Sequence, residues 1–420
     1  MKRLHLQLHL LSSLLLAIFA ASAATAQTAD TIATTNVAPG VTHTRFVRNV
    51  GPWIVNVVRV ELRRTDLDFE HARAHDQLRT RERVTDMAKR YAAAGTPVIV
   101  GINADFFNLQ SGEAENNQIV RGEWWKGVKV TDSPFDTFRN VHIQFALDSA
   151  RQPMIDRFRF DGVVRSRNGA LPIIALNANP GADPEATALY TPRFGPTTPR
   201  DTVRVTSEVV LSAAGRRGDT LLYLRLGVPS SVSGTAIPSD GVVLSGYGAR
   251  AKEVAAIAEG DTLRVVLAVS PRPASRAPMQ LLIGGWPRVV RDGQNVAANA
   301  AVDEGTISRN AEVRHPRSAV AFNRDSTQLL LVVVDGRSEK SVGMTTAELG
   351  TLLIELGAWQ GMNFDGGGST TMVVKDKIVN SPSDGTGERE VGNALLVLSK
   401  RAAAPARSSR STDTPLTSPR

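Results

Sequence analysis

Residues 363–374 read NFDGGGSTTMVV, and this stretch is predicted to hold two strands joined by a glycine bend. One strand ends at Phe364, and the next runs over 371–374. Three successive glycines let the backbone adopt positive φ and approach a ligand closely. Their N–H groups, with the hydroxyls of Ser369 and Thr370, favour an anion-binding nest. The alternative is an ordinary hairpin turn, although such a turn needs only one or two glycines.

The elements before and after this bend are regular. Residues 328–334 are almost continuously apolar, which predicts a buried strand. Thr345 and Glu348 form a capping box ahead of four leucines at helical spacing, so a helix is predicted there. A last strand is predicted over 391–398.

The remainder of the chain alternates short strand patterns with turn residues. Residues 53–62 and 97–102 are predicted strands, and between them a helix with Thr80 as its N-cap is expected. From about 141 to 271, short strand patterns are separated by Gly, Pro, Asn and Asp, which favours antiparallel pairing. The expected fold class is α+β, a mixed and predominantly antiparallel β-sheet core with a few packed helices.

The two ends of the chain differ from the part between them. Lys2 and Arg3 precede an apolar run that ends in an A-x-A cleavage site at Ala26, as in secretory signals. The chain is therefore divided into a signal peptide (1–26), a flexible leader (27–43), an N-terminal α/β part (44–140), a β-rich middle region (141–280), a C-terminal part (281–399) and a disordered tail (400–420).

Composition narrows the classes of function. Of the 420 residues 42% are hydrophobic and 21% charged, as expected for a soluble globular protein. The absence of cysteine excludes disulfides, zinc–thiolate sites and thiol nucleophiles. Most of the formal charge of +8 lies in the two ends, which argues against a nucleic-acid partner. We expect an exported bacterial protein, periplasmic or extracellular, with no stable membrane insertion after signal cleavage.

Three predicted strands deliver an acid at their ends, beside glycine or a small polar residue. A side chain at a strand end is held rigidly and still faces the loops where a ligand binds. We expect these acids to converge beside the glycine bend. The three groups are Asn103 with Asp105, Asp335 with Arg337, and Asp365 with Ser369.

Other residues have a functional and a structural interpretation when each is taken alone. Arg317 and Arg337 have the fork-shaped group that clamps phosphate or carboxylate, although a lone arginine is more often part of a surface ion pair. His71 and His75 lie in a charge-rich stretch without an obvious third ligand, so solvated side chains are expected there. The run 284–287 (GGWP) is predicted to form the wall of a pocket.

Taken together, several of these motifs resemble the phosphodiester glycosidase family, from about residue 44 to residue 399. The resemblance rests on NADFF (103–107), GVVLSGYG (241–248), LIGGWPRVVRDG (282–293), HPRSAVAF (315–322), LLLVVVDGRS (329–338), GMTTAEL (343–349), NFDGGGSTTMVV (363–374) and VGNALLV (391–397). The family's usual Gly-Gly-Gly-Pro reads Gly-Gly-Trp-Pro here, which changes the expected pocket wall.

The resemblance implies hydrolysis of a sugar-1-phosphodiester at the anomeric C–O bond. Such a reaction needs carboxylates near C1 and cationic groups around the phosphate. The catalytic residues are then expected to be Asp365 and Asp105, with Asp335 as a third acid or as a group that positions the sugar. Substrate binding is expected from Asn103, Gly285, Arg317, Arg337, Gly366, Gly367, Gly368 and Ser369. No cofactor is required by this reading, and the partner is a sugar-phosphate or glycan substrate.

Two alternatives stay open at this level. The three aspartates are also suited to hold Mg²⁺ or Ca²⁺ in a phosphodiesterase that cleaves the P–O bond. The third reading is a glycan-binding envelope protein without turnover, because a fold alone does not establish activity.

Overall fold

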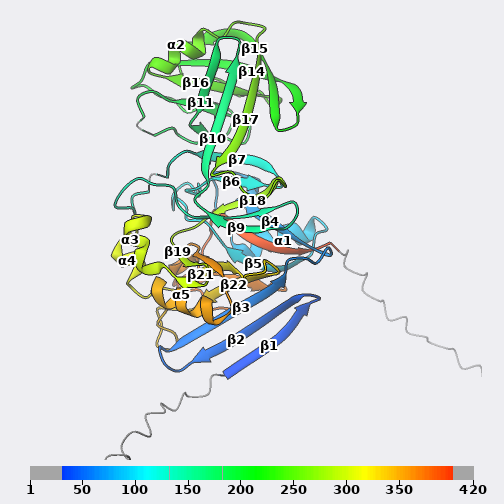
Figure 1. The fold of residues 1–420 in the computed structure, drawn as a ribbon, viewed down its shortest axis with the longest axis vertical. Coiled ribbons are helices and arrows are strands. Elements are labelled where there is room, and N and C mark those ends of the chain that lie inside the picture. The colour runs from blue at the N-terminus through cyan, green and yellow to red at the C-terminus, as the bar shows by residue number, and fades with distance from the viewer. Residues whose placement is uncertain (1–30, 132, 182, 401–420) are drawn as a thin grey trace, which may run out of the picture.

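The computed structural model describes residues 31–131, 133–181 and 183–400. Its strands form three sheets, in which the described pairs are antiparallel except for β12 with β13 (Figure 1). The predicted signal peptide and the predicted tail beyond Lys400 lie outside these residues. The expectation of a mainly antiparallel β-sheet core with few helices is confirmed.

The largest sheet of the molecule's body joins the two ends of the described chain. Its eight strands combine the first three with five from the C-terminal part. In spatial order they are β1 (Thr31–Ala38), β2 (Val41–Arg48), β3 (Trp53–Glu61), β22 (Gln328–Val334), β21 (Arg317–Phe322), β23 (Gln360–Asn363), β19 (Arg288–Arg291) and β20 (Gln294–Asn295).

A second sheet of five strands lies beside the first. Its spatial order is β25 (Lys377–Ile378), β24 (Met372–Val374), β5 (Val98–Asn103), β26 (Asn393–Ser399) and β4 (Leu67–Arg73). A buried apolar cluster joins the facing sides of the two sheets, including Leu331 from β22 and Leu395 from β26.

Helices cover the outer faces of both sheets. Helix α5 (Thr346–Glu355) packs Leu349, Leu352 and Leu353 on the eight-stranded sheet, and α1 (Val84–Ala93) packs on the five-stranded one. Because β22 is covered on both faces, all its residues from 329 to 334 are buried, which explains the apolar run in the sequence.

The third sheet continues from the body into the upper lobe of Figure 1. The part at the body includes β7, β6 and β18, and the lobe holds β10, β14–β17 and α2 (Ala249–Ala255). The spatial order is β11 (Gly169–Ile173), β10 (Arg159–Ser166), β17 (Thr262–Ser270), β15 (Thr220–Ser230), β14 (Thr206–Arg217), β16 (Gly241–Tyr247), β13 (Thr187–Tyr190), β12 (Ala175–Leu176), β7 (Glu123–Val128), β6 (Gln118–Val120), β18 (Met279–Gly284), β8 (Gln144–Asp148) and β9 (Pro153–Asp156).

Strands from different predicted parts of the chain pair within the same sheet. Strand β3 pairs with β22, β6 pairs with β18, and β7 pairs with β12, so each segment completes a sheet begun by another. The remaining helices are short. They are α3 (Ala300–Asp303), α4 (Ser308–Ala311) and three 3₁₀ turns at Ala74–Asp76, Ala297–Asn299 and Gly367–Ser369.

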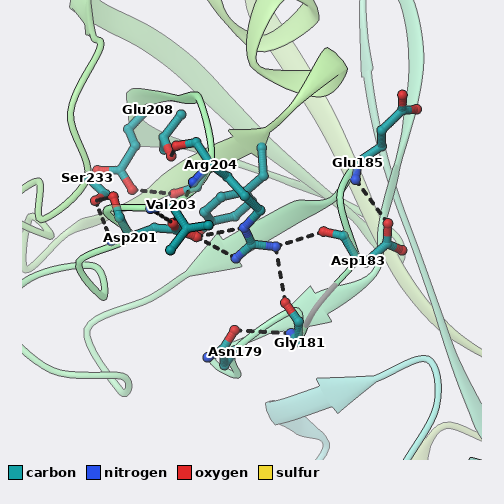
Figure 2. Close-up of polar contacts among 12 residues, drawn as sticks. Asn179, Gly181, Asp183, Glu185, Asp201, Val203, Arg204, Glu208 and Ser233 are labelled. Carbon is teal, nitrogen blue, oxygen red and sulfur yellow. Dashed lines mark hydrogen bonds and ion pairs between the residues drawn. The ribbon is translucent and has the colours of Figure 1, made fainter.

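Figure 2 shows the polar cluster that holds the loops of the upper lobe. The Arg204 guanidinium donates to the Asp201 carboxylate (2.6 Å) and to the carbonyl oxygens of Gly181 (3.1 Å) and Asp183 (2.8 Å). It also lies over the Tyr247 ring, 4.2 Å from the ring centroid. These contacts tie two loops to β16 and include none of the predicted site residues, so we assign them a structural role.

Two predicted elements differ in the structure. The leader was expected to be flexible, but from residue 31 it forms β1 and β2, because its β-branched residues pair along the edge of the large sheet. Helix α1 begins at Val84 instead of after Thr80, since the backbone of Glu82 pairs with Val391 and the Thr80 hydroxyl donates to the Ala74 carbonyl oxygen.

The predicted capping box of α5 is confirmed. The Thr345 hydroxyl accepts from the Glu348 amide (3.1 Å), and the Glu348 carboxylate accepts from the Thr345 amide (2.9 Å). We expect Thr345→Ala to lower the free energy of unfolding by about 1 kcal/mol, because an amide loses its cap. Urea denaturation measures this change. Thr351→Ala, on the exposed side of the same helix, is the control, and an equal loss in both variants would contradict the prediction.

Candidate active site

The triple-glycine segment connects two sheets and is not a hairpin. Strand β23 before it pairs with β21 and β19, whereas β24 after it pairs with β5 and β25. The Asp365 amide donates to the carbonyl oxygen of Ala104 (2.8 Å), immediately after β5. The bend therefore brings Asp365 beside the segment that carries Asn103 and Asp105.

Asn103 is the central hydrogen-bonding residue of this crossing. Its Nδ2 donates to the carbonyl oxygen of Asp365 (2.7 Å), and its Oδ1 accepts from the Ser318 hydroxyl (2.6 Å) and the Thr371 amide (3.1 Å). The side chain is fully buried. Asn103 therefore holds the bend in place, and both polar atoms of its side-chain amide form hydrogen bonds within the protein.

Each of the three positions in the bend requires glycine for a different structural reason. Gly367 has φ +60°, which side chains rarely adopt. A Cβ on Gly366 would lie 2.6 Å from the carbonyl oxygen of Pro316, and one on Gly368 would overlap Asp384 and Arg389. The sequence is thus explained by close backbone packing at Gly366, by the side chains packed against Gly368 and by the backbone conformation at Gly367.

The bend does not form the open anion-binding nest expected from its glycines. The amides of Gly367, Ser369 and Thr370 donate to the carbonyl oxygens of Pro316, Gly366 and Gly367, and the Gly366 amide hydrogen-bonds the Asp365 carboxylate. A ligand at the bend is therefore met mainly by the side chains around it.

Asp105 follows β5, and its carboxylate and backbone amide form three hydrogen bonds. Its carboxylate accepts from the side chain (2.7 Å) and the backbone amide (3.1 Å) of Asn116, and its own amide donates to Asn393 (2.8 Å). A Cβ on Gly284 would overlap this carboxylate, so that glycine permits the approach of β18. Burial raises the pKa of Asp105, while the Asn116 bonds and the charge of His142 lower it.

Glu115 is a third acid of the cluster, and the sequence analysis did not single it out. Burial raises its pKa, and the negative charge of Asp105 raises it further, while His142 and a hydrogen bond from Ser133 lower it. Glu115 lies in a loop and does not directly follow a strand, so the expectation of acids at strand ends does not identify it. Glu115 is near Asp105 because its loop folds back toward the site.

The pKa of Asp365 is strongly shifted. Burial raises its pKa from 3.8 to about 7, and the charge of Glu115 adds to the rise. The Ser369 hydroxyl, the Arg389 charge and the Gly366 amide act in the opposite direction. A carboxyl group with this pKa exchanges protons readily near neutral pH, as general acid–base catalysis requires.

Asp335 has other hydrogen-bond partners than these three acids. Its carboxylate accepts from the Ser381 amide (2.9 Å) and from the Asn380 side chain, and its pKa is raised by burial. Asn380 in turn donates to the carbonyl oxygen of Thr370 (3.0 Å) and accepts from the Met372 amide (2.8 Å). Asp335 thus anchors the loop after β25 to the strand that leaves the bend.

Arg317 points to the opposite face of its strand from the site. In β21, Ser318 contacts Asn103, so the preceding residue faces α5. The buried Arg317 guanidinium donates to the carbonyl oxygens of Met344 (2.8 Å), Asn310 (2.7 Å) and Val313 (3.1 Å). The expected phosphate clamp is therefore engaged in holding backbone.

Two other arginines lie against the glycine bend. The Arg337 guanidinium is beside Gly367 and 3.3 Å from the Ser383 hydroxyl, with its side chain 43% exposed. Arg389 forms a two-point pair with Asp384 (2.7 and 3.0 Å) against Gly368. Arg389 lies in a polar loop, GTGEREVGN, where nothing in the local pattern marked it as a site residue.

The wall next to the acids is built by the GGWP run. A Cβ on Gly285 would lie 2.6 Å from the carbonyl oxygen of Asn363, which the backbone of β18 approaches here. Trp286 is buried, and its amide donates to the same oxygen (2.8 Å). Gly285 is therefore a packing position of the wall.

The ligand set of the metal alternative is not assembled. The Asp335 carboxylate accepts hydrogen bonds from Ser381 and Asn380. Within residues 31–131, 133–181 and 183–400, no group of three or more His, Asp or Glu residues is placed to hold a metal ion. In the same residues, no helix is long and apolar enough to cross a membrane.

Two surface cavities lie elsewhere on the molecule. One of about 540 Å³ borders β1–β3, and one of about 400 Å³ lies between β9 and Trp359. Neither is lined by Asp105, Glu115 or Asp365. The candidate active site is therefore defined by its converging carboxyl and guanidinium groups and not by cavity volume.

Comparison with known proteins shows which family part of this chain resembles. Residues 222–398 match the family described as phosphodiester glycosidase. The chain resembles the phosphodiester glycosidases. The matched segment holds Asp335, Asp365 and Arg389, whereas Asp105 and Glu115 lie before it and are brought to it by the fold.

Individual relatives cover only part of the chain. An uncharacterized SPβ prophage-derived protein of Bacillus subtilis, YomE, is 37% identical over 92 residues, 22% of this chain and 14% of its own length. The bovine N-acetylglucosamine-1-phosphodiester α-N-acetylglucosaminidase is 32% identical over 114 residues, 26% of this chain. The chain spans about a fifth or less of the length of these relatives.

Two solved structures share the fold over most of the chain. A hypothetical protein from Synechocystis has a TM-score of 0.69 at 22% identity, covering 89% of this chain and 64% of its own. A protein of Burkholderia pseudomallei K96243 has a TM-score of 0.67 at 18% identity, covering 88% and 96%.

Proposed function

We propose that the protein hydrolyses the anomeric C–O bond of a sugar-1-phosphodiester, of the N-acetylglucosamine-1-phosphodiester type, to free sugar and a phosphomonoester. The observation that carries this proposal is the convergence of Asp105, Glu115 and Asp365 next to Arg337 and Arg389 at the bend. Carboxyl groups near an anomeric carbon and cations near a phosphate are the two requirements of this reaction.

The proposed step uses Asp365 as the proton-transfer group. Water adds its oxygen to C1 and gives a proton to the Asp365 carboxylate, while the C1–O bond breaks with its electron pair on the phosphate oxygen. Asp105 and Glu115 stabilise the positive charge that develops on the sugar ring. Arg337 and Arg389 stabilise the phosphate as it leaves. Asp335 and Arg317 are proposed to hold the surrounding backbone.

The proposed setting is the bacterial periplasm or exterior, and the substrate is proposed to belong to a glycan of the cell envelope or an exopolysaccharide. This rests on the N-terminal sequence, which is typical of an exported protein. No nucleic-acid partner and no metal cofactor enter the proposal.

The position of bond cleavage tests the proposed function. The full chain is incubated with N-acetylglucosamine 1-(methyl phosphate) in ¹⁸O-water, and the products are examined by mass spectrometry. We expect free sugar carrying ¹⁸O at C1 and unlabelled methyl phosphate. Label in the phosphate would show P–O cleavage and support the phosphodiesterase alternative. Tight binding without any product would favour the glycan-binding alternative.

A further inference from the structure

His142 lies just before β8 and forms a buried pair with Asp136. Its Nε2 is 2.8 Å from Asp136 Oδ2, and neither side chain is more than 2% exposed. The same carboxylate oxygen accepts from Asn140 Nδ2 at 3.3 Å. A carboxylate bound to one ring nitrogen fixes both the orientation of an imidazole and the nitrogen that carries its proton.

A second contact fixes the plane of the His142 ring. The ring stacks on Trp286, with centroids 5.2 Å apart and planes 9° from parallel. Trp286 is itself held, because its Nε1 donates to the carbonyl oxygen of Glu304 (3.1 Å) and its amide to that of Asn363 (2.8 Å).

The topology carries His142 to the acids of the candidate active site. Gln144, two residues further along, pairs with Gly284, and a Cβ on Gly284 would overlap the Asp105 carboxylate. The segment before His142 also reaches the site, since Thr131 donates to Asn116 (2.9 Å), the residue that holds Asp105. His142 therefore shares its surroundings with the partners of Asp105.

Four carboxyl groups interact with the His142 ring, one by direct contact and three through charge. They are Asp136, which it contacts, and Asp105, Glu115 and Glu304, whose pKa values the charge of His142 lowers. Lys126 also lowers the pKa of Asp105 and Glu115, and Arg157 lowers that of Glu304. The buried Arg73 is a further cation that interacts with the charge of Asp105. Among the described residues, the buried His142 Nδ1 has no hydrogen-bond partner, which is uncommon for a buried polar atom.

We propose that His142, oriented by Asp136 and Trp286, is a positioning residue of the candidate active site that keeps Asp105 and Glu115 in their ionised forms. The proposal rests on the proposed function for its catalytic meaning. When its ring is protonated, His142 offsets the repulsion between the two acids, which otherwise favours protonation of one of them. The acids then retain the negative charge that stabilises the sugar ring in the transition state.

The titration of the two acids tests this role directly. In protein carrying ¹³C-labelled carboxyl groups, NMR follows Asp105 and Glu115 from pH 3 to 9 in the wild type and in His142→Gln. We expect the midpoints of both to rise by about 1 pH unit in the variant, because a nearby cation is lost. With a substrate that turns over, the acidic limb of kcat/KM is expected to move upward by a similar amount.

A matched variant separates this role from simple loss of packing. His71→Gln also replaces a fully buried histidine, whose Nδ1 donates to the Ile119 carbonyl oxygen (3.2 Å). The expectation that this side chain is solvated is wrong. His71→Gln is expected to lower stability and leave both midpoints where they are. Midpoints that stay or fall in folded His142→Gln would overturn the proposal. Absence of turnover in the wild type would instead overturn the proposed function, since the NMR titration needs no catalysis.

Discussion

Asp365→Asn is expected to lower kcat for sugar-1-phosphodiester hydrolysis by about 10³-fold while the protein stays folded. The amide has the size of the carboxyl group but takes up no proton, and loss of a general acid–base group costs 10²–10⁴-fold. Because burial raises the pKa of Asp365 to about 7, the wild-type group exchanges protons at the pH of the assay. Release of free sugar under saturating substrate measures kcat.

The control for this loss is a second aspartate near the same bend. Asp376 lies in the exposed turn between β24 and β25, with φ +63°, a conformation that asparagine also adopts. Asp376→Asn is expected to retain wild-type turnover. If Asp365→Asn keeps more than about a tenth of the activity, Asp365 is not the proton-transfer group of the reaction.

The second large effect is on stability, and it depends on pH. The pKa of Asp365 is raised on folding, so between pH 4 and 7 the folded protein binds this proton more tightly than the unfolded chain does. The stabilisation is complete below the ordinary pKa and is lost as the pH rises through about 7. The change in pKa corresponds to roughly 4 kcal/mol at most, and solvent at this partly accessible residue reduces it to about 2 kcal/mol.

We therefore expect Asp365→Asn to gain stability relative to the wild type as the pH rises. Other buried acids also contribute to the pH dependence of stability, but they are common to both proteins, so their contributions cancel in the difference. Urea denaturation at pH 4.5 and pH 8 gives the free energy of unfolding of each protein, and the difference is expected to grow by about 2 kcal/mol in favour of the variant. A difference that is equal at the two pH values, or smaller at pH 8, would contradict the raised pKa.

The two predictions reflect one trade-off between stability and catalysis at Asp365. A carboxyl group buried beside Glu115 is costly to ionise, and the same burial brings its pKa into the range useful for proton transfer. Removing the charge is therefore expected to stabilise the fold and abolish the reaction, as at many active sites.

The sequence allowed the elements next to the site to be predicted because their signals are local. The apolar run of β22 and the capping box of α5 each depend on residues within a few positions of one another. Asn103, Asp105 and Asp365 were found by the same kind of rule, as polar residues that follow buried strands.

Other parts of the site had no local signal. Glu115, His142 and Arg389 lie in loops or at their ends, and they reach the acids through contacts between segments far apart in the chain. The direction of Arg317 depends on which face of β21 is covered by α5, a choice that the residues of β21 alone do not make. The glycines were recognised as a bend, but their need for close approach appears only when Pro316 and Asp384 lie against them.

By itself, the sequence determined the strands next to the site, the main helices and the acids at strand ends, because hydrogen bonding and side-chain periodicity act over short distances along the chain. Only the tertiary structure decided which of these acids share one environment. Asp335 and Asp365 follow similar strands, yet one is bound by Ser381 and the other lies beside Glu115. The physical reason is that burial and neighbouring charge, which set the chemistry of a carboxyl group, come from residues that the fold brings together.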